Sequence, residues 1–466
     1  MPVDVGEETA VRTWLESDRF VPARVVRPIQ RFGRIEAAGG LVMVAAGAVA
    51  LLWANSPWHR GYDALWSASV DLTVGPVTVL HSTARGLVND VAMTLFFFVV
   101  TAGVKREVLA GELGDRRRAS LPVLAALGGM VVPAVLYLGI TGSGRAAGGW
   151  GIPTATDIAL AVGVLSLLGR RVPLGTKAFL LTLAVVDDVG GIVLIAVVYS
   201  GTLSLPWLAA SLAALGCAAL LRRWHVRAVP VYAVVATLCW LALSRSGVEP
   251  TMTGVAFALL TPLRAHLDPS HTPRRAAPLL AAVAVDPEAT DRSARALGEL
   301  SRLARASSSP LERVLLRVTP WVSYAVVPAF ALANVGLPVR GMQLDAVGRE
   351  VAVGVVLAFV VGKPLGILLT CWAACRLRMG ALPRDSTWTT LTGAAICAGI
   401  GCTVSLFIAR LSLVAPAEQD AARLGVLVAS LASAVGCLIF VLLTSRSPRR
   451  DGGRPIPTST RIGSTP

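Results

Sequence analysis

Two adjacent carboxylates, Asp187 and Asp188, lie at the centre of the apolar segment LLTLAVVDDVGGIVLIAVVYS, residues 180–200. A segment of this length and composition is typical of a helix that crosses a membrane. On insertion scales, each charge at the middle of such a helix costs roughly 2.5–3.5 kcal/mol. Charges at this depth usually face a partner or a water-filled cavity, and they mark functional sites.

Two further ionisable residues lie inside apolar segments, Asp157 in GGWGIPTATDIALAVG and Lys363 in VVLAFVVGKPLGILL. The chain has 40 Arg but only three Lys. Burial favours loss of a proton from lysine, whereas arginine keeps its charge, so this lysine indicates a group that exchanges a proton. The alternative to a functional site is a set of ion pairs that only fix helix packing. That alternative does not explain why three acids accompany one base.

The spacing of the acids predicts two different roles. Neighbouring residues of a helix project about 100° apart, so Asp187 and Asp188 cannot share a proton as a protease dyad does. One of them can pair with Lys363 while the other faces a second site, together with Asp157. Converging carboxylates repel one another, which favours binding of a proton or of a small hard cation with oxygen ligands. Competition between the two at one site is sufficient for exchange.

Composition indicates a polytopic membrane protein. The 466 residues are 54% hydrophobic and only 15% charged, with a mean hydropathy of +0.66. The net charge of +15 does not indicate nucleic-acid binding, because the basic residues form short clusters between apolar runs. The cysteines lie in or beside apolar runs without metal-type pairing, and the histidines lie outside the spans, so no cofactor is expected. No cleavable signal peptide is expected either.

The apolar runs predict twelve spans and an all-α fold. They lie near 37–53, 86–104, 120–140, 152–169, 177–199, 204–221, 229–244, 252–263, 320–338, 351–373, 390–409 and 424–444. With the N-terminus inside, 34 of the 43 basic residues fall in inside segments and 8 in outside segments, so both termini are expected in the cytoplasm.

The domain organisation follows from these spans. We expect a cytoplasmic tail at 1–36, a membrane domain at 37–445 and a disordered cytoplasmic tail at 446–466. A long cytoplasmic loop, 264–319, is expected to be a partly helical or disordered linker. Between the first two spans, SVDLTVGPVTVLHS (69–82) alternates apolar and polar residues around a Gly-Pro turn and predicts a β-hairpin on the outside. The edge of that hairpin either pairs with a second copy or lies on its own subunit.

Glycine, proline and hydroxyl residues interrupt the fourth and eleventh spans, in GGWGIPTATDIALAVG and ICAGIGCTVSLFIA. Each is the middle span of a set of three, 3–5 and 10–12, and the two sets have opposite orientation. Interrupted helices at matching positions of inverted repeats indicate an ion site at the middle of the membrane in secondary transporters. Their unpaired helix ends supply partial charges that offset nearby side chains.

Several segments together resemble the NhaA family of bacterial sodium/proton antiporters, over nearly all of residues 36–445. They are AAGGLVMVAAGAVALLWANSPW, FFFVVTAGVKREVLAGEL, PVLAALGGMVVPAVLYL, IPTATDIALAVGVLSLLGRRVPL, LTLAVVDDVGGIVLIAVVY, GKPLGI and GIGCTVSLFIA. The resemblance implies a multi-pass protein of the bacterial cell membrane that is not an enzyme. It would extrude Na⁺, and Li⁺, in electrogenic exchange for external H⁺, for pH and sodium homeostasis and salt tolerance.

The resemblance also implies roles for individual residues. Asp188 is the main site for Na⁺ and the proton, with Asp157 beside it, and Asp187 pairs with Lys363. Thr156 matches the threonine of the unwound segments that cross. Dimerisation through the hairpin near 70–82 is likewise implied.

Residues for a response to pH are implied as well, and here the sequence departs from the family. Lys105, Arg106, Glu107 and Glu249 match such positions, although Glu249 stands where a familiar member has histidine. Gly103 replaces a glutamate of the family pattern, and Cys402 replaces the phenylalanine of a GFT motif. These departures concern pH regulation more than the exchange.

Two alternatives remain to be weighed against an antiporter. A sodium-coupled organic-anion transporter of the same fold would need a roomier polar cavity and has no need of three acids around one lysine. An intramembrane aspartyl protease would need acids on different helices in a GxGD context, which the adjacent pair Asp187-Asp188 does not provide.

Overall fold

The computed structural model describes residues 38–444, apart from gaps at 75–76, 111–115, 200–202, 225–228, 264–271, 286–289, 308, 340–341, 343 and 384. Among these residues, seven helices are long and apolar enough to cross a membrane, and up to nine if each of two bent helix pairs forms one span. The chain is therefore an all-α polytopic membrane protein. The predicted tails at 1–36 and 446–466 lie outside the described residues.

The chain begins with an apolar helix, a short helix at 113° to it, and a two-stranded sheet. The bounds in this part are α2 (Ala38–Ala54), α3 (His59–Ser67), β1 (Ser69–Val74), β2 (Val77–Thr83), α4 (Ala84–Leu87), the π-helical turn η4 (Val88–Ala92) and α5 (Met93–Ala110). The hairpin predicted at 69–82 is present, with Ser69 opposite Thr83 and Val74 opposite Val77. We call the end of the molecule that carries this hairpin the hairpin face.

Two long helices flank a broken one in the next part of the chain. The bounds are α6 (Arg116–Thr141), the 3₁₀ helix η6 (Arg145–Thr154), α7 (Ile158–Leu167), η7 (Gly169–Arg171) and α8 (Leu174–Val198). The axes of η6 and α7 differ by 48°. Asp187 and Asp188 lie near the middle of α8.

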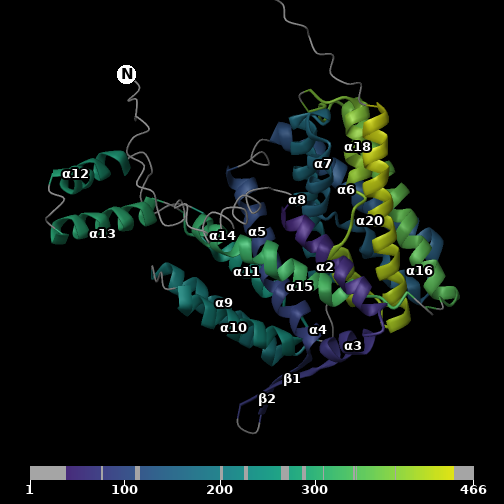
Figure 1. The fold of residues 1–466 in the computed structure, drawn as a ribbon, viewed down its shortest axis with the longest axis horizontal. Helices are drawn as coiled ribbons and strands as arrows, with labels where there is room; N and C mark the ends of the chain where they lie inside the picture. Colours follow the sequence, from purple (N-terminus) through teal and green to yellow (C-terminus); the bar gives the residue numbers. More distant parts are fainter. Residues whose placement is uncertain are drawn as a thin grey trace, which may run out of the picture.

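A pair of helices and a helical segment of the long loop follow. The bounds are α9 (Leu205–Arg223), α10 (Val229–Ser246), α11 (Met252–Leu260), α12 (Thr272–Val285) and α13 (Thr290–Ser307). Helices α9 and α10 pack together beside the main bundle, and α12 and α13 form a pair that projects from it (Figure 1). The loop predicted at 264–319 thus contains helices in its described residues.

The C-terminal part contains two continuous helical segments with π-helical turns and a second broken helix. The bounds are α14 (Pro310–Trp321), η9 (Val322–Val326), α15 (Val327–Asn334), α16 (Ala346–Leu357), η10 (Ala358–Gly362), α17 (Lys363–Arg376), α18 (Trp388–Cys397), α19 (Thr403–Ser412) and α20 (Pro416–Thr444). Prolines follow two of the π turns, Pro328 after η9 and Pro364 after η10. Proline lacks an N–H and crowds the carbonyl four residues earlier. The backbone hydrogen bonds of the helix therefore shift locally to the wider pattern of a π turn.

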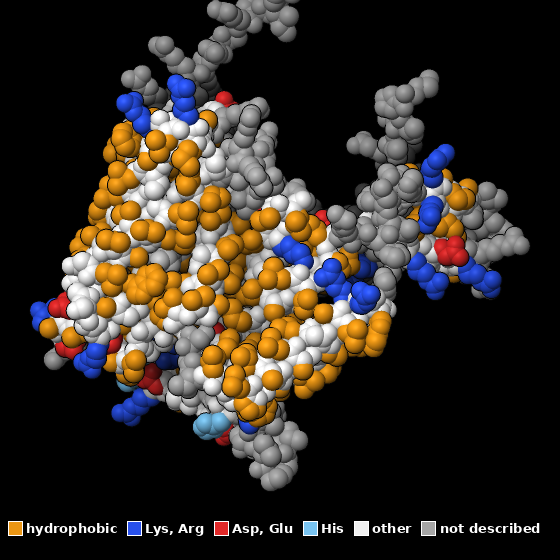
Figure 2. Space-filling view, turned by 180° about the vertical axis from the view of Figure 1, so that it is seen from behind, with side chains coloured by type: hydrophobic (Ala, Val, Ile, Leu, Met, Phe, Trp, Pro, Cys, Tyr) orange, Lys and Arg blue, Asp and Glu red, His pale blue; other side chains and the backbone are white. Residues whose placement is uncertain are grey.

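The outer surface of the bundle is apolar. On the face shown in Figure 2, hydrophobic side chains cover the helices, and charged side chains gather near the ends of the bundle and on the projecting helices. Exposed side chains include Leu127 and Val131 on α6, Val197 on α8 and Leu431 on α20. A soluble protein would bury such residues, whereas a bilayer solvates them.

All twelve predicted spans contain helix. Five of them are shorter than a full span, or are divided, among the described residues: α2, the pair η6 and α7, α10, α11, and the pair α18 and α19. The predicted eighth span corresponds to α11, which has nine residues.

Candidate functional site

The two breaks within helices lie against one another. Ala155–Asp157 separates η6 from α7, and residues 398–402 separate α18 from α19. The Asp157 N–H donates to the Ile400 carbonyl over 2.8 Å, and the Ser405 hydroxyl donates to the Ala155 carbonyl over 3.4 Å. Backbone groups at the breaks lack a hydrogen-bond partner within their own helix. Groups of the opposite segment supply one, as buried backbone requires.

Asp157 receives donors from the N-terminal ends of two helices. As the N-cap of α7, it accepts the Leu160 N–H at Oδ1 over 3.1 Å. At the first residue of α19, the Thr403 N–H and hydroxyl donate to Oδ2 over 3.2 and 3.0 Å. Helix N-termini carry partial positive charge and exposed N–H donors, so together they favour a negative charge at this buried position.

Lys363 contacts a helix end of opposite sign, the C-terminal end of η6. Its Nζ is 3.1 Å from Asp187 Oδ2 and donates to the Thr154 carbonyl, at the end of η6, over 2.7 Å. Neither Lys363 nor Asp187 has exposed surface. The Thr156 hydroxyl lies 2.8 Å from Asp187 Oδ2 and 3.0 Å from the Ala398 carbonyl. Thr156 therefore joins α8 to both breaks.

Asp188 lies beside Asp187, whose Oδ2 contacts Lys363 and Thr156 and whose Oδ1 is also buried without a partner among the described residues. The Asp188 side chain is 3% exposed, and its Oδ1 has no hydrogen-bond partner within the described part of the chain. Asp187 and Asp157 lie close enough to act on Asp188 electrostatically, and Lys363 acts with the opposite sign. A buried carboxylate with an unused oxygen among like charges is suited to bind a proton or a small cation.

The position of Lys363 depends on close packing between α6 and α17. A Cβ on Gly366 would lie 2.1 Å from the Gly128 carbonyl oxygen, and one on Gly128 would lie 2.5 Å from the Gly366 carbonyl oxygen. Only glycine allows this approach. The π turn η10 ends immediately before Lys363, as such turns often do at functional positions.

The four candidates for a pH response do not gather at one place. Lys105 Nζ donates to the Leu259 and Thr261 carbonyls, over 2.5 and 2.6 Å, and so caps the C-terminal end of α11. Its neighbours Arg106 and Glu107 are exposed and half-buried. Glu249 lies before the opposite end of α11 and is buried; desolvation and the Asp90 carboxylate raise its pKa to about 7, and Arg410 opposes them.

Three residues with contacts at or near these sites were not singled out from the sequence as partners. Thr403 appeared only as part of a helix break, because its contact with Asp157 depends on two segments 246 positions apart. Asp90 and Arg410 form an ion pair of 2.9 Å on the hairpin face. Both lie near the ends of predicted spans, where burying a charge costs little free energy. A charge at the end of a span was therefore the only feature of the sequence that pointed to them.

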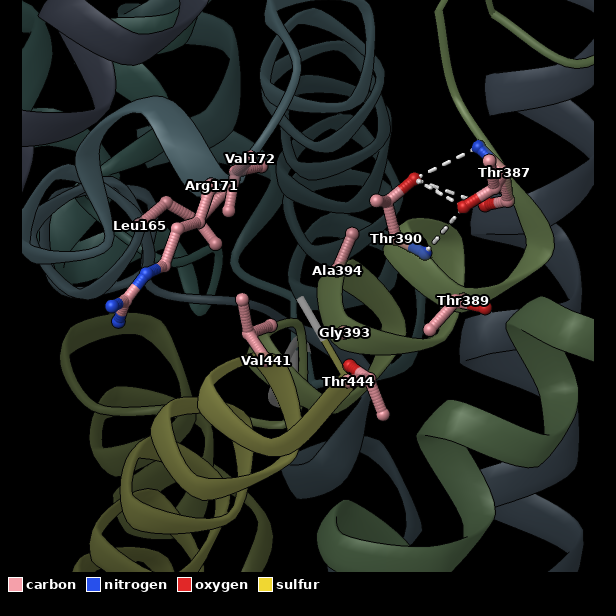
Figure 3. Close-up of a pocket in the computed structure, with 10 residues that line it drawn as sticks. All are labelled: Leu165, Arg171, Val172, Thr387, Thr389, Thr390, Gly393, Ala394, Val441 and Thr444. Carbon is pink, nitrogen blue, oxygen red and sulfur yellow. Dashed lines mark hydrogen bonds between the residues drawn. The ribbon is translucent and has the colours of Figure 1, made fainter. Parts of the chain in front are cut away.

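A cavity of about 310 Å³ lies elsewhere, between η7, α18 and α20. Figure 3 shows Thr387 and Thr390 joined by hydrogen bonds of the helix cap of α18, and the Arg171 guanidinium turned away from them. None of the four intramembrane charges lines this cavity. It is therefore separate from the candidate ion site.

Comparisons with known proteins identify the family of the chain. The family described as Na⁺/H⁺ antiporter 1 matches residues 30–442. The Na(+)/H(+) antiporter NhaA 2 of Myxococcus xanthus is 42% identical over 430 residues, which cover 91% of each chain. The Na(+)/H(+) antiporter NhaA of Anaeromyxobacter sp. is 42% identical, covering 91% of this chain and 94% of its own. That of Rhizobium meliloti is 38% identical over 91% and 97%. With a family match over most of its length and relatives about 40% identical over 91% of the chain, the chain belongs to the Na⁺/H⁺ antiporter 1 family.

Proposed function

We propose that this protein exchanges Na⁺, and also Li⁺, for H⁺, and that the two kinds of ion compete for Asp188 with Asp157 beside it. The observation that carries the proposal is the unpartnered buried oxygen of Asp188, set among Asp157, Asp187 and Lys363. Entry of a cation replaces a bound proton at the same oxygens, so each ion leaves as the other binds.

Asp187 and Lys363 have a different role in this proposal. Their ion pair and the Thr156 hydroxyl use the Asp187 oxygen that faces the crossing. A cation near Asp188 would repel the ammonium of Lys363 and weaken this pair. Lys363 can then release its proton, which an arginine in its place would retain. Such coupling supports electrogenic exchange, with more protons moving than sodium ions.

Alternating access follows from burial of the site. Asp157 and Asp188 are 6% and 3% exposed, so an ion reaches them only when the surrounding helices move. We infer that η6 with α7 and α18 with α19 are two interrupted spans within a set of twelve, with both termini in the cytoplasm. The membrane is that of a bacterial cell, where the exchange serves sodium and pH homeostasis. The relatives' names do not favour a sodium-coupled organic-anion transporter.

Everted membrane vesicles or proteoliposomes test the exchange directly. A transmembrane pH difference, followed with a fluorescent dye, should collapse when Na⁺ or Li⁺ is added and should persist when K⁺ is added. Absence of a response to Na⁺ and Li⁺ at neutral and alkaline pH would overturn the proposed function.

The role of Asp188 is tested by Asp188→Asn, which keeps the size of the side chain and removes its charge. We expect no Na⁺-dependent exchange above background, because the amide cannot bind a proton as a carboxylate does. Glu350→Gln is the matched control, since it removes an exposed carboxylate from α16. Unimpaired exchange by Asp188→Asn would refute the assigned role while leaving the exchange itself intact.

A further inference from the structure

Two cysteines lie side by side between the membrane helices α18 and α20. All seven cysteines of the chain are free thiols. Cys397 is the last residue of α18, Cys437 lies on α20, and neither side chain has exposed surface. Each of the two thiols acts on the other. We call these two residues the thiol pair.

Backbone contacts give the position of the thiol pair independently. The Cys437 thiol donates to the Gly393 carbonyl over 3.3 Å. Gly393 lies one turn before Cys397 on α18, and a helical side chain tilts toward the N-terminus of its helix. The Cys397 side chain therefore covers the turn that Cys437 contacts. One residue earlier on each helix, a Cβ on Gly436 would lie 3.6 Å from a methyl group of Ile396, so the two helices face one another here.

The thiol pair also contacts the helix that carries Asp157. The Cys397 thiol donates over 3.4 Å to the carbonyl of Ala161, in the first turn of α7. The Ala161 N–H in turn donates to the Asp157 carbonyl over 2.9 Å. Ala398, the residue after Cys397, accepts the Thr156 hydroxyl over 3.0 Å. The thiol pair thus joins α7, α18 and α20 within one turn of the candidate ion site.

The chemistry of the thiol pair suits a soft metal ion. Thiolate sulfur is a soft ligand and selects soft metals, whereas Na⁺ and Li⁺ prefer oxygen. Thiols are weak hydrogen-bond donors, so little is lost when each S–H leaves its backbone carbonyl. Two sulfurs that approach from neighbouring helices supply both ligands of a linear site, the geometry that Hg²⁺ adopts with sulfur. Each sulfur forms a bond to the metal and releases its proton to water, and no group is oxidised or reduced.

Burial determines which charge the metal ion carries. The cysteines lie in an apolar cluster with Ala394, Ala398 and Val441, where an uncompensated charge is costly. A divalent ion replaces two protons and leaves the site neutral. A monovalent soft ion such as Ag⁺ would leave one negative charge. Zn²⁺ would also give a neutral site, but it is almost always bound by four ligands, and the pair supplies only two sulfurs.

We propose that the thiol pair binds a soft divalent cation that prefers two sulfur ligands, as Hg²⁺ does, and that the bound cation stops exchange. The bridge of sulfur, metal and sulfur ties the end of α18 to α20. It thereby fixes the adjoining break, where the Ile400 carbonyl accepts the Asp157 N–H over 2.8 Å. An ion reaches Asp157 only when the helices around the breaks move. The effect on exchange rests on the proposed function, whereas binding of the cation does not.

Binding is tested on the purified protein with HgCl₂, a neutral compound that enters apolar protein. Native mass spectrometry in the presence of a competing monothiol should count one more retained Hg²⁺ in the wild type than in Cys397→Ser or Cys437→Ser. Serine keeps a donor for the same carbonyl, which favours normal folding. Cys239→Ser is the matched control, because Cys239 is also buried and donates to a carbonyl of a neighbouring helix, that of Ser211. Equal counts in Cys397→Ser and Cys239→Ser would overturn the proposal.

Methylmercury chloride separates a bridge from modification of single thiols, since it forms only one bond to sulfur. HgCl₂ should raise the melting temperature of the wild type, because a ligand that links two helices stabilises the folded state. Methylmercury chloride should not raise it, and neither compound should raise it in Cys437→Ser. Equal effects of the two compounds on the wild type would show that no bridge forms and would refute the site.

Proteoliposomes, which contain no other protein, test the effect on exchange. HgCl₂ should abolish Na⁺-dependent exchange in the wild type, a dithiol should restore it, and Cys397→Ser should exchange in the presence of HgCl₂. Cys402 is the competing explanation, because it lies within electrostatic range of Asp157 and could block the ion site as a single thiol. Cys402→Ser should therefore remain sensitive. Protection by Cys402→Ser but not by Cys397→Ser would contradict the proposal.

The two readouts distinguish failure of this proposal from failure of the proposed function. If the wild type retains Hg²⁺ at the thiol pair but never responds to Na⁺, the proposed exchange fails and the metal site stands. If it exchanges Na⁺ for H⁺ equally well with and without HgCl₂, only the present proposal fails.

Discussion

At the scale of single residues, the buried pair of Lys363 and Asp187 relates stability to function. Both side chains lack exposed surface, and Lys363 also donates to a carbonyl at the end of η6. Removing one partner of a buried pair leaves the other uncompensated, which costs more than the pair contributes. Substitution of either residue should therefore destabilise the protein. An ion that competes for one of them can still weaken the pair.

Substitutions of Lys363 should separate charge from proton release. Lys363→Arg should retain the fold and shift the pH profile of exchange upward, because the guanidinium keeps its charge at higher pH. Lys363→Ala should lower the free energy of unfolding by roughly 3–5 kcal/mol, since it leaves Asp187 unpaired. Thermal unfolding in detergent and vesicle transport check these outcomes; an unchanged profile in Lys363→Arg would count against titration of the lysine.

Glu249 should make stability depend on pH in a defined direction. Its pKa rises from 4.5 to about 7 on folding, so the folded state favours the protonated form. This contribution is present below pH 4.5 and is lost as the pH rises through about 7. Glu249→Gln should therefore raise the melting temperature relative to wild type at alkaline pH and should change it little at acid pH. An equal effect at both pH values would contradict the burial of this carboxyl.

At the scale of elements, the ion site is set by how closely α6 approaches α17. A Cβ on Gly366 would lie 2.1 Å from a backbone oxygen of α6, which cannot move aside as a side chain does. The two helices must therefore separate if this glycine is replaced. Lys363 lies one turn earlier on α17, so its contacts with Thr154 and Asp187 would change as well.

Gly366→Ala should lower both stability and exchange. Overpacking of this kind costs typically 1–3 kcal/mol. Gly216→Ala on α9 is the matched control, because nothing lies within 4 Å of its added Cβ. Alanine is a better helix former by about 0.5–1 kcal/mol, so the control should unfold at a slightly higher temperature and exchange normally. Equal behaviour of the two variants would refute close packing at Gly366.

At the scale of the whole molecule, we propose the hairpin, the one sheet among the described residues, as the surface for assembly. A two-stranded sheet is marginally stable alone, and its outer edges present unpaired backbone groups. Asp71 and His81 form an exposed contact across the strands. Pairing of this edge with a second copy would satisfy those groups and form a homodimer.

Replacing residues 70–82 by a short Gly-Ser linker tests this assembly. The fraction of dimer measured by native mass spectrometry should fall, while exchange per subunit persists, because the hairpin lies outside the helix breaks. Removal of residues 446–466 serves as a control that shortens the chain elsewhere and should leave the dimer intact. A dimer that survives loss of the hairpin would assign the interface to another surface.

The sequence by itself determined the class of protein and the residues that bear charge in the membrane. Apolar length and the cost of burying charge are local properties, so the spans and the set of Asp157, Asp187, Asp188 and Lys363 could be predicted. The family was also predictable, because the motifs GKPLGI and LTLAVVDDVGG carry it. The hairpin was predictable from alternation around a turn.

Only the tertiary structure decided which group meets which. The contacts of Thr403 with Asp157 and of Asp90 with Arg410 join positions far apart in the chain. The resemblance implied the pairing of Asp187 with Lys363, and the structure supplies its geometry. Hydropathy and helical period give the direction of a side chain only relative to its own helix. The contact itself depends on how helices cross, and that is set by packing between α6 and α17 and by the two breaks.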